Sequence, residues 1–272
     1  VLYGMTCGVS IADLFTSGFV PGIMLTVAMS IYAVIWGTKH RDICTVYKFS
    51  LREFLIALKN AIWAILMPVI ILGGIYSGMF TPTEAAIVAC IYGLFVGCVI
   101  YRQLTLKKIV EILRSSVSTT AITMIILCAV NIFAFVINSN NASVYIQSFV
   151  ASLAHNKFQF WVVITILLLI LGALMDTPPA IMLIGTFIMP ILNMYDVSPL
   201  AFGLILIVNL GIGLCTPPVG SGLFVAKTLR KDITTADLLN IHLLIYILIC
   251  IAVMIILMAF PQLITVLPSL FN

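Results

Sequence analysis

Two clusters of proline and polar residues interrupt apolar sequence in the second half of the chain, and chemistry could occur there. The first is Asp-Thr-Pro-Pro-Ala at 176–180, and the second is Thr-Pro-Pro-Val-Gly at 216–220. Consecutive prolines remove backbone donors and disfavour helix in the preceding residue, so each cluster interrupts a helix. Carbonyl groups without helical partners and threonine hydroxyls are ligands that a dehydrated Na⁺ requires, while the N-termini of half-helices favour anions. The clusters therefore predict a site for a cation and an anionic ligand.

Asp176 lies where two apolar runs meet, at a depth where water cannot freely solvate a carboxylate. Two interpretations stay open. The side chain accepts local backbone hydrogen bonds in a hairpin turn, or the turn faces the segment 209–222. Glycine at four positions of that segment would allow close backbone approach; these residues are Gly211, Gly213, Gly220 and Gly222.

Two other carboxylates lie beside apolar sequence. Glu84 follows Thr-Pro-Thr at an expected helix start, where a carboxylate can pair with the helix dipole, so a capping role and a functional role are equally supported. Asp196 comes just before Ser198 and Pro199 and is expected in an exterior turn.

The composition defines the environment of these clusters. Of 272 residues, 63% are hydrophobic and 8% are charged, and the mean hydropathy is +1.26. A soluble domain is ~25% charged, so the composition excludes water-soluble, disordered and coiled-coil proteins and predicts an all-α polytopic membrane protein. The net charge of +4 comes from scattered residues and does not make a nucleic-acid-binding surface. The cysteines form no C-x-x-C pair, so neither a metal site nor a disulfide framework is expected.

Apolar runs along the chain predict about eight to ten membrane-embedded segments. Most are long enough to cross a bilayer, whereas 158–175 and 178–194 are marginal and 218–229 is too short. These three short runs lie beside the proline clusters. The nine runs are 16–36, 61–79, 83–101, 117–137, 158–175, 178–194, 199–215, 218–229 and 240–260.

Basic residues predict the orientation, because short loops rich in Lys and Arg stay in the cytoplasm. They gather in 37–60, 102–114 and 227–231. Placing these stretches inside is consistent if 158–194 is either two thin spans or one hairpin and if 199–229 is one broken span. The C-terminus would then lie in the periplasm. Two amphipathic stretches, 50–62 and 105–116, either lie flat in the membrane interface or extend the following spans.

Three long motifs occur in order along the chain: GGIYSGMFTPTEAA at 73–86, GALMDTPPAIMLIGTFIMPIL at 172–192 and FGLILIVNLGIGLCTPPVGSGLFVA at 202–226. In these motifs the sequence resembles the large membrane (M) subunit of tripartite ATP-independent periplasmic (TRAP) transporters. The opening residues VLYGMTCGVSIADLFTSGFVPGIML are similar to the family's segment after its first broken helix. The resemblance therefore implies the C-terminal portion of such a subunit, with a first hairpin and an Ile-Pro-Pro-Ser-type break preceding Val1.

This resemblance implies an ion-transporter-like elevator fold and a Na⁺-coupled symporter in the bacterial inner membrane. The substrate would be a C4-dicarboxylate, sialic acid or another organic acid, delivered by a periplasmic substrate-binding protein. A small (Q-type) four-helix membrane subunit would complete the transporter.

The resemblance also assigns roles along the chain. Residues 1–157 would be mostly scaffold and in-plane arm helices, with 1–12 the tail of the first broken helix. Residues 158–229 would form half of the transport domain, as a hairpin (158–194) and a broken helix (199–229), and 230–272 would return to the scaffold. The expected Na⁺ ligands are Gly172, Asp176, Thr177, Gly213 and Thr216, and the expected substrate-binding residues are Pro178, Asn209, Pro217 and Gly220.

Two other classes are weaker alternatives. An intramembrane aspartyl protease needs two carboxylates that share a proton, but Asp176 and Asp196 lie at opposite ends of 178–194, roughly 25 Å apart along a helix. A channel usually lines a continuous pore, whereas the polar features here are confined to two breaks. No Lys or Arg lies within the breaks, so the partner of a substrate carboxylate is left open.

Overall fold

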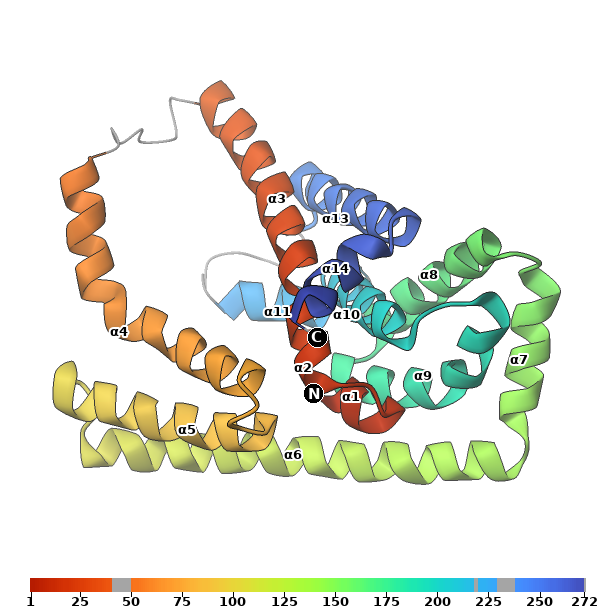
Figure 1. The fold of residues 1–272 in the computed structure, drawn as a ribbon, viewed down its shortest axis with the longest axis horizontal. Helices are drawn as coiled ribbons and strands as arrows, with labels where there is room; N and C mark the ends of the chain where they lie inside the picture. Colours follow the sequence, from red (N-terminus) through yellow and green to blue (C-terminus); the bar gives the residue numbers. More distant parts are fainter. Residues whose placement is uncertain (41–49, 218–219, 229–237, 272) are drawn as a thin grey trace. The chain divides into compact units, whose positions relative to one another are not determined.

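Helices form the regular structure of this protein, as Figure 1 shows for a computed structural model. The structure describes residues 1–40, 50–217, 220–228 and 238–271, and that part of the chain contains no strand. Within it, seven helical segments are long and apolar enough to cross a membrane, which confirms the predicted all-α polytopic fold. They are Ile11–Lys39, Leu51–Tyr76, Pro82–Ile100, Leu106–Ile137, Lys157–Leu174, Thr177–Tyr195 and Ile241–Ala259.

The chain forms two compact units, residues 36–124 and residues 1–35 with 125–272. The smaller unit contains a helical hairpin of α4 (Leu51–Tyr76) and α5 (Pro82–Phe95), and α5 continues into a π-helical turn at Val96–Ile100. The Tyr92 hydroxyl donates to the Trp63 carbonyl oxygen at 2.8 Å and joins the two helices.

Glu84 caps α5, as one of its two interpretations predicted. Its Oε2 accepts from the Thr81 backbone N–H at 2.7 Å and from the Thr81 hydroxyl at 2.8 Å, and Thr81 Oγ1 accepts from the Glu84 N–H. This reciprocal capping box satisfies donors that the first turn of a helix leaves free. Ser50 similarly caps α4 by accepting from the Glu53 N–H at 3.4 Å.

The two amphipathic stretches continue directly into apolar helix. The first lies at the start of α4, and the second begins α6 (Leu106–Ser139). The most apolar windows of both helices are 0% buried within this chain, so their apolar faces are available to lipid or to another polypeptide. The in-plane orientation of the amphipathic stretches stays a prediction.

The larger unit is built around three consecutive helices. They are α8 (Lys157–Leu174), α9 (Thr177–Leu192) and α10 (Pro199–Leu214). Around them lie α1 (Leu2–Cys7), α2 (Ile11–Ser17), α3 (Phe19–Lys39), α7 (Ala142–Leu153), the 3₁₀ turn Asn193–Tyr195, α11 (Ser221–Thr228), α13 (Ile241–Ala259) and α14 (Gln262–Phe271).

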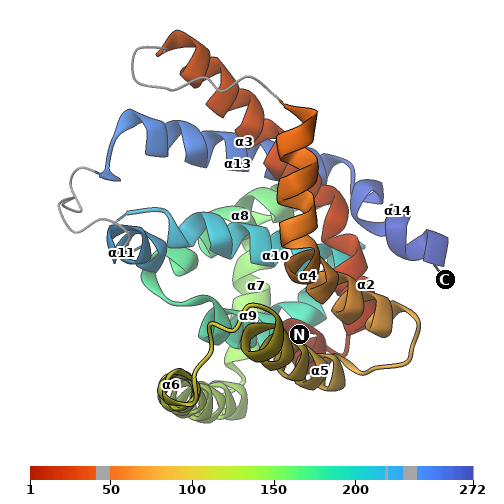
Figure 2. The same cartoon turned by 90° about the vertical axis from the view of Figure 1, so that its left-hand side faces the viewer.

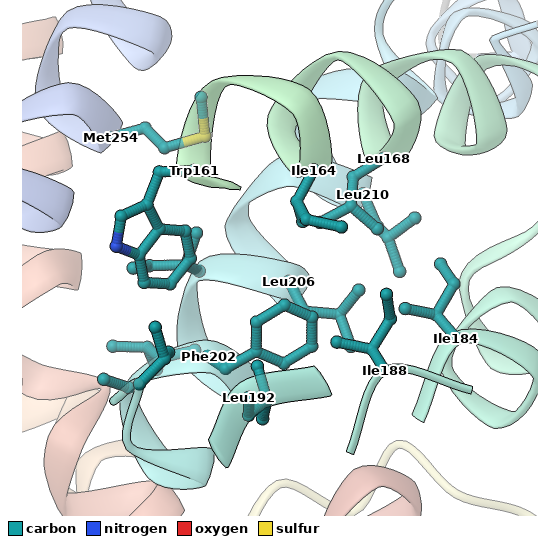
Figure 3. Close-up of a cluster of buried hydrophobic side chains, with 14 of the residues drawn as sticks. Trp161, Ile164, Leu168, Ile184, Ile188, Leu192, Phe202, Leu206, Leu210 and Met254 are labelled. Carbon is teal, nitrogen blue, oxygen red and sulfur yellow. The ribbon is translucent and has the colours of Figure 1, made fainter. Parts of the chain in front are cut away.

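Apolar side chains from the three central helices meet in one core, shown in Figure 3. Leu168 of α8, together with Leu206 and Leu210 of α10, is 0% exposed. Ile188 of α9 faces the same core, and Met254 of α13 also belongs to it. Burial of such side chains contributes about 1.5–3 kcal/mol each, so the core fixes α8 against α10.

The first helix packs on the same group. The Tyr3 hydroxyl donates to the Pro199 carbonyl oxygen at 2.7 Å. The Tyr3 ring lies against Gly203 of α10, where a Cβ atom would be only 2.2 Å from the ring. Residues at the start of the chain therefore belong structurally with α9 and α10.

The proline clusters end helices as the sequence predicts. The backbone is extended at Met175 and Asp176, between α8 and α9. The predicted broken span is divided at 215–220, because α10 ends at Leu214 and α11 begins at Ser221. At ~1.5 Å per residue, α10 is about 24 Å long, which is shorter than a ~30 Å hydrocarbon core.

Candidate functional site

The hairpin tip and the interrupted helix meet through glycine. Figure 2 shows α10 beside α8, with α11 beyond the end of α10. A Cβ atom at Gly213 would lie 2.6 Å from the Gly172 Cα and 3.0 Å from the Ala173 nitrogen. These contacts are with backbone that cannot rotate away, so the two helices touch where each one ends. Sequence reasoning predicted this approach, and the structure brings Gly172 and Gly213 together.

Gly220 joins the interruption to the end of α8. Its N–H donates to the Ala173 carbonyl oxygen at 3.4 Å, and its φ of 37° lies in the left-handed region. A Cβ atom there would be 2.9 Å from the Thr216 carbonyl oxygen and 3.1 Å from that of Leu214. Only glycine fits this conformation and crowding without strain. The backbone after the break therefore folds back onto the carbonyl end of α10.

Thr216 adds a hydroxyl to these carbonyl groups. Its Oγ1 donates to the Ile212 carbonyl oxygen at 2.8 Å, and its N–H donates to the Gly213 carbonyl oxygen at 2.9 Å. Because the hydroxyl proton is used in the first bond, the oxygen lone pairs stay available to a cation. The Leu214 carbonyl accepts no hydrogen bond from the described residues. The end of α10 thus presents the unpaired Leu214 carbonyl oxygen and the lone pairs of the Thr216 hydroxyl.

Asp176 occupies the N-cap position of α9, but its side chain makes no capping hydrogen bond. The interpretation that its carboxylate accepts local backbone bonds is therefore wrong for this structure. The Asp176 side chain is exposed within this chain, so its carboxylate oxygens are accessible to a ligand or to another polypeptide. Asp196, in contrast, lies in a turn as predicted, with φ 51°, and its backbone carbonyl accepts from Lys157 Nζ at 2.6 Å.

The start of α9 offers few donors to an anion. Pro178 and Pro179 have no N–H, and the Ala180 N–H already donates to the Asp176 carbonyl oxygen at 3.3 Å. Thr177 and Pro178 are half-buried. Among the described residues, no hydrogen bond joins the Thr177 hydroxyl to the end of α10. The structure thus places these two predicted ligands at the tip without a direct bond to α10.

Asn209, one of the predicted substrate-binding residues, lies buried in the protein. Its side chain is 0% exposed, yet neither Nδ2 nor Oδ1 has a hydrogen-bond partner. It lies one turn before Gly213 on α10. An unpaired buried amide costs about 1–3 kcal/mol. The Asn209 side chain is therefore suited to hydrogen bonding with a bound ligand, a water molecule or a further polypeptide.

Of the predicted substrate-binding residues, Pro217 is exposed within this chain; its neighbour Pro218 falls outside the described residues. The described chain contains no group of three or more His, Cys, Asp or Glu side chains that could hold a metal ion. The groups at the break that could bind a cation are instead neutral carbonyl and hydroxyl oxygens, with the Asp176 carboxylate at the tip. Ala173 was missed by sequence reasoning, because an alanine gives no signal that its carbonyl bonds across the break.

Fold and site together define a polytopic helical membrane protein in which a hairpin tip packs against an interrupted helix. Residues 1–263 match the family model described as "Tripartite ATP-independent periplasmic transporter, DctM component". The chain therefore belongs to this TRAP transporter family, as its large (M) component, and is not an enzyme.

Several curated proteins are similar to this chain. It is 35% identical to the sialic acid TRAP transporter large permease protein SiaM of Vibrio cholerae, over 100% of this chain and 63% of that protein. It is 37% identical to the C4-dicarboxylate TRAP transporter large permease protein DctM of Pseudomonas aeruginosa, over 84% of this chain and 53% of that protein. The isethionate TRAP transporter permease protein DctMQ of Oleidesulfovibrio alaskensis is 36% identical, over 84% of this chain and 36% of that protein. The chain thus spans about three-fifths or less of the length of these relatives.

Proposed function

We propose that this chain forms part of a Na⁺-coupled secondary transporter that moves an organic acid across the bacterial inner membrane. The contact between Gly172 and Gly213 carries the proposal, because it joins a hairpin tip to the end of an interrupted helix, where the Leu214 carbonyl accepts no bond from the described residues. Paired interrupted elements of this kind recur at the binding sites of secondary transporters.

Na⁺ would bind where these two elements meet. Thr216 would contribute its hydroxyl oxygen, and Gly172 and Gly213 their carbonyl oxygens. Asp176 and Thr177 would complete the site from the tip, and the free carboxylate of Asp176 would balance the charge of the ion. This donor set suits Na⁺, a hard cation that enters such sites as cargo and is held by oxygen atoms.

The substrate carboxylate would bind beside the ion at the start of α11. The N–H groups of Ser221 and Gly222 donate no hydrogen bond to the described residues, and a helix N-terminus favours an anion. Asn209 and Gly220 would lie close to this end of the site, with Pro178 and Pro217 at its border. The relatives' names specify sialic acid, C4-dicarboxylate and isethionate, which supports an acidic substrate such as a C4-dicarboxylate or a sugar acid.

The complete transporter would contain further polypeptides. The uncovered apolar faces of α4 and α6 would pack against the lipid bilayer and a small Q-type four-helix subunit. A periplasmic binding protein would deliver the acid, and the hairpin with its broken helix would carry it across by an elevator movement. The distribution of Lys and Arg supports a periplasmic C-terminus.

The experiment uses the full-length protein that contains this chain, reconstituted in proteoliposomes with its small subunit and binding protein. Uptake of labelled sialic acid and of a labelled C4-dicarboxylate is measured with a Na⁺ gradient and again with K⁺ in its place. The proposal predicts saturable uptake of one acid that requires both Na⁺ and the binding protein. Equal uptake in K⁺ would refute the coupling, and uptake that does not saturate would favour a channel.

A further inference from the structure

An apolar groove lies on the larger unit, away from the hairpin tip. It runs between α8 and α13, has a volume of about 640 Å³, and is lined largely by apolar side chains. Trp161 and Met254, which are 5% and 0% exposed, belong to its lining, and Ile166 and Ile255 are exposed residues along it. Its volume lies within the ~300–1,000 Å³ typical of ligand sites, so the groove is large enough for a hydrocarbon chain.

A second, more polar pocket of about 290 Å³ adjoins one end of the groove. The two share Lys157 and Trp161, so they form one continuous surface from apolar to polar. Asp196 also lines the polar pocket, together with Ser198 and Gln262. The continuous surface therefore has a long apolar part and a charged end, as an amphipathic ligand does.

The two charges at this end are not paired with each other. Lys157 Nζ donates to the Asp196 backbone carbonyl at 2.6 Å, and no ion pair within 4.0 Å joins Lys157 to a carboxylate in the described chain. An ammonium group has three donors, so Lys157 keeps two for another acceptor. The Asp196 side chain likewise keeps its acceptors, because the αL backbone at φ 51° fixes only its main chain. The polar pocket thus presents one cation and one anion for separate partners.

We propose that this surface binds a phosphatidylethanolamine molecule. One acyl chain lies in the groove between α8 and α13, the phosphate accepts from Lys157, and the headgroup ammonium donates to Asp196. A zwitterionic headgroup matches both charges at once, whereas a purely anionic headgroup would meet repulsion from Asp196. Lys157 is the first residue of α8 and Trp161 follows one turn later, which is where basic and aromatic residues anchor to headgroups.

The test uses Trp161 as its reporter, since bromine atoms on an acyl chain quench a tryptophan that they contact. The full-length protein with its small subunit is prepared with Trp161 as the sole tryptophan, the others being replaced by Phe. It is reconstituted in phosphatidylcholine containing increasing fractions of dibrominated phosphatidylethanolamine or of dibrominated phosphatidylcholine. The proposal predicts that the ethanolamine lipid quenches at a mole fraction lower by about threefold or more, because the quaternary ammonium of phosphatidylcholine has no N–H to donate to the Asp196 carboxylate.

Charge-removing variants then identify the headgroup contacts. Asp196→Asn should reduce the preference for phosphatidylethanolamine, and Lys157→Gln should weaken quenching by both lipids because both carry the phosphate. Lys107→Gln, at an exposed lysine on α6, should preserve both the preference and the quenching. Equal quenching by both lipids in the starting protein would overturn the proposal, as would the same loss in the Lys107 variant. Absence of quenching by either lipid, with a tryptophan at the exposed position Ile170 of α8 outside the groove still quenched (Ile170→Trp), would show that polypeptide fills the groove and would also overturn the proposal.

Discussion

Replacing Gly213 with alanine tests the contact between the hairpin tip and the interrupted helix most sharply. The new Cβ atom would lie 2.6 Å from the Gly172 Cα and 2.7 Å from its carbonyl carbon. Carbon atoms pack at ~3.5–4.0 Å, so α8 and α10 would have to separate by about 1 Å at this point. The Gly220 N–H to Ala173 carbonyl bond, at 3.4 Å, is already long and would break.

The expected cost follows from this geometry. Extra volume in a tightly packed contact destabilises by about 1–3 kcal/mol. At roughly 2–4 °C per kcal/mol for a protein of more than 150 residues, this corresponds to a melting temperature lower by roughly 2–12 °C. Gly172→Ala should cost less, because its Cβ atom would meet the nearest backbone atoms at 3.1–3.2 Å.

Gly211→Ala is the matched control on the same helix, because a Cβ atom there meets nothing within 4 Å. Thermal unfolding of the detergent-purified complex is followed by the loss of its size-exclusion peak after heating. The order of destabilisation should be Gly213 first, then Gly172, with Gly211→Ala close to the unchanged protein. Equal melting temperatures for the Gly213 and Gly211 variants would refute the close packing of the tip on the break.

Three further substitutions separate capping, burial and binding. Asp176→Ala should raise the Na⁺ concentration for half-maximal uptake by about tenfold. Membrane insertion should stay unchanged, because the Asp176 carboxylate makes no local capping bond. Unchanged Na⁺ dependence would exclude Asp176 as a ligand. Asn209→Leu should keep or raise the melting temperature, because it removes two unpaired buried polar atoms, and it should abolish uptake. A large loss of stability would mean that the Asn209 amide has a structural partner. Glu84→Ala should lower the melting temperature through loss of the bonds from Thr81, while Glu111→Ala, exposed on α6, should leave it unchanged.

The helix interruptions were predictable because they depend on local chemistry. Proline lacks an N–H and restricts the residue before it, so the ends of α8 and α10 follow from the sequence around 176–180 and 216–220. The cap by Glu84 was foreseen as one of two possibilities, since threonine and glutamate three residues apart form a capping box without tertiary contacts.

Other features depend on contacts between distant residues and could not be predicted in the same way. The bond from Gly220 to Ala173 requires the α8–α10 crossing, and the ring of Tyr3 fits Gly203 only after α1 has packed on α10. The free carboxylate of Asp176 was also uncertain, because an aspartate before a helix usually caps it. Here the two prolines of the first turn remove N–H donors that such a cap would bind.

The central claim, that the tip and the break bind Na⁺, is tested most directly by the Na⁺ dependence of uptake in Thr216→Val and Thr216→Ser. Valine keeps the shape of threonine but removes the oxygen, whereas serine keeps the oxygen and removes a methyl group. The account predicts that valine raises the Na⁺ concentration for half-maximal uptake by about tenfold and that serine leaves it nearly unchanged. A valine variant with unaltered Na⁺ dependence would contradict the account.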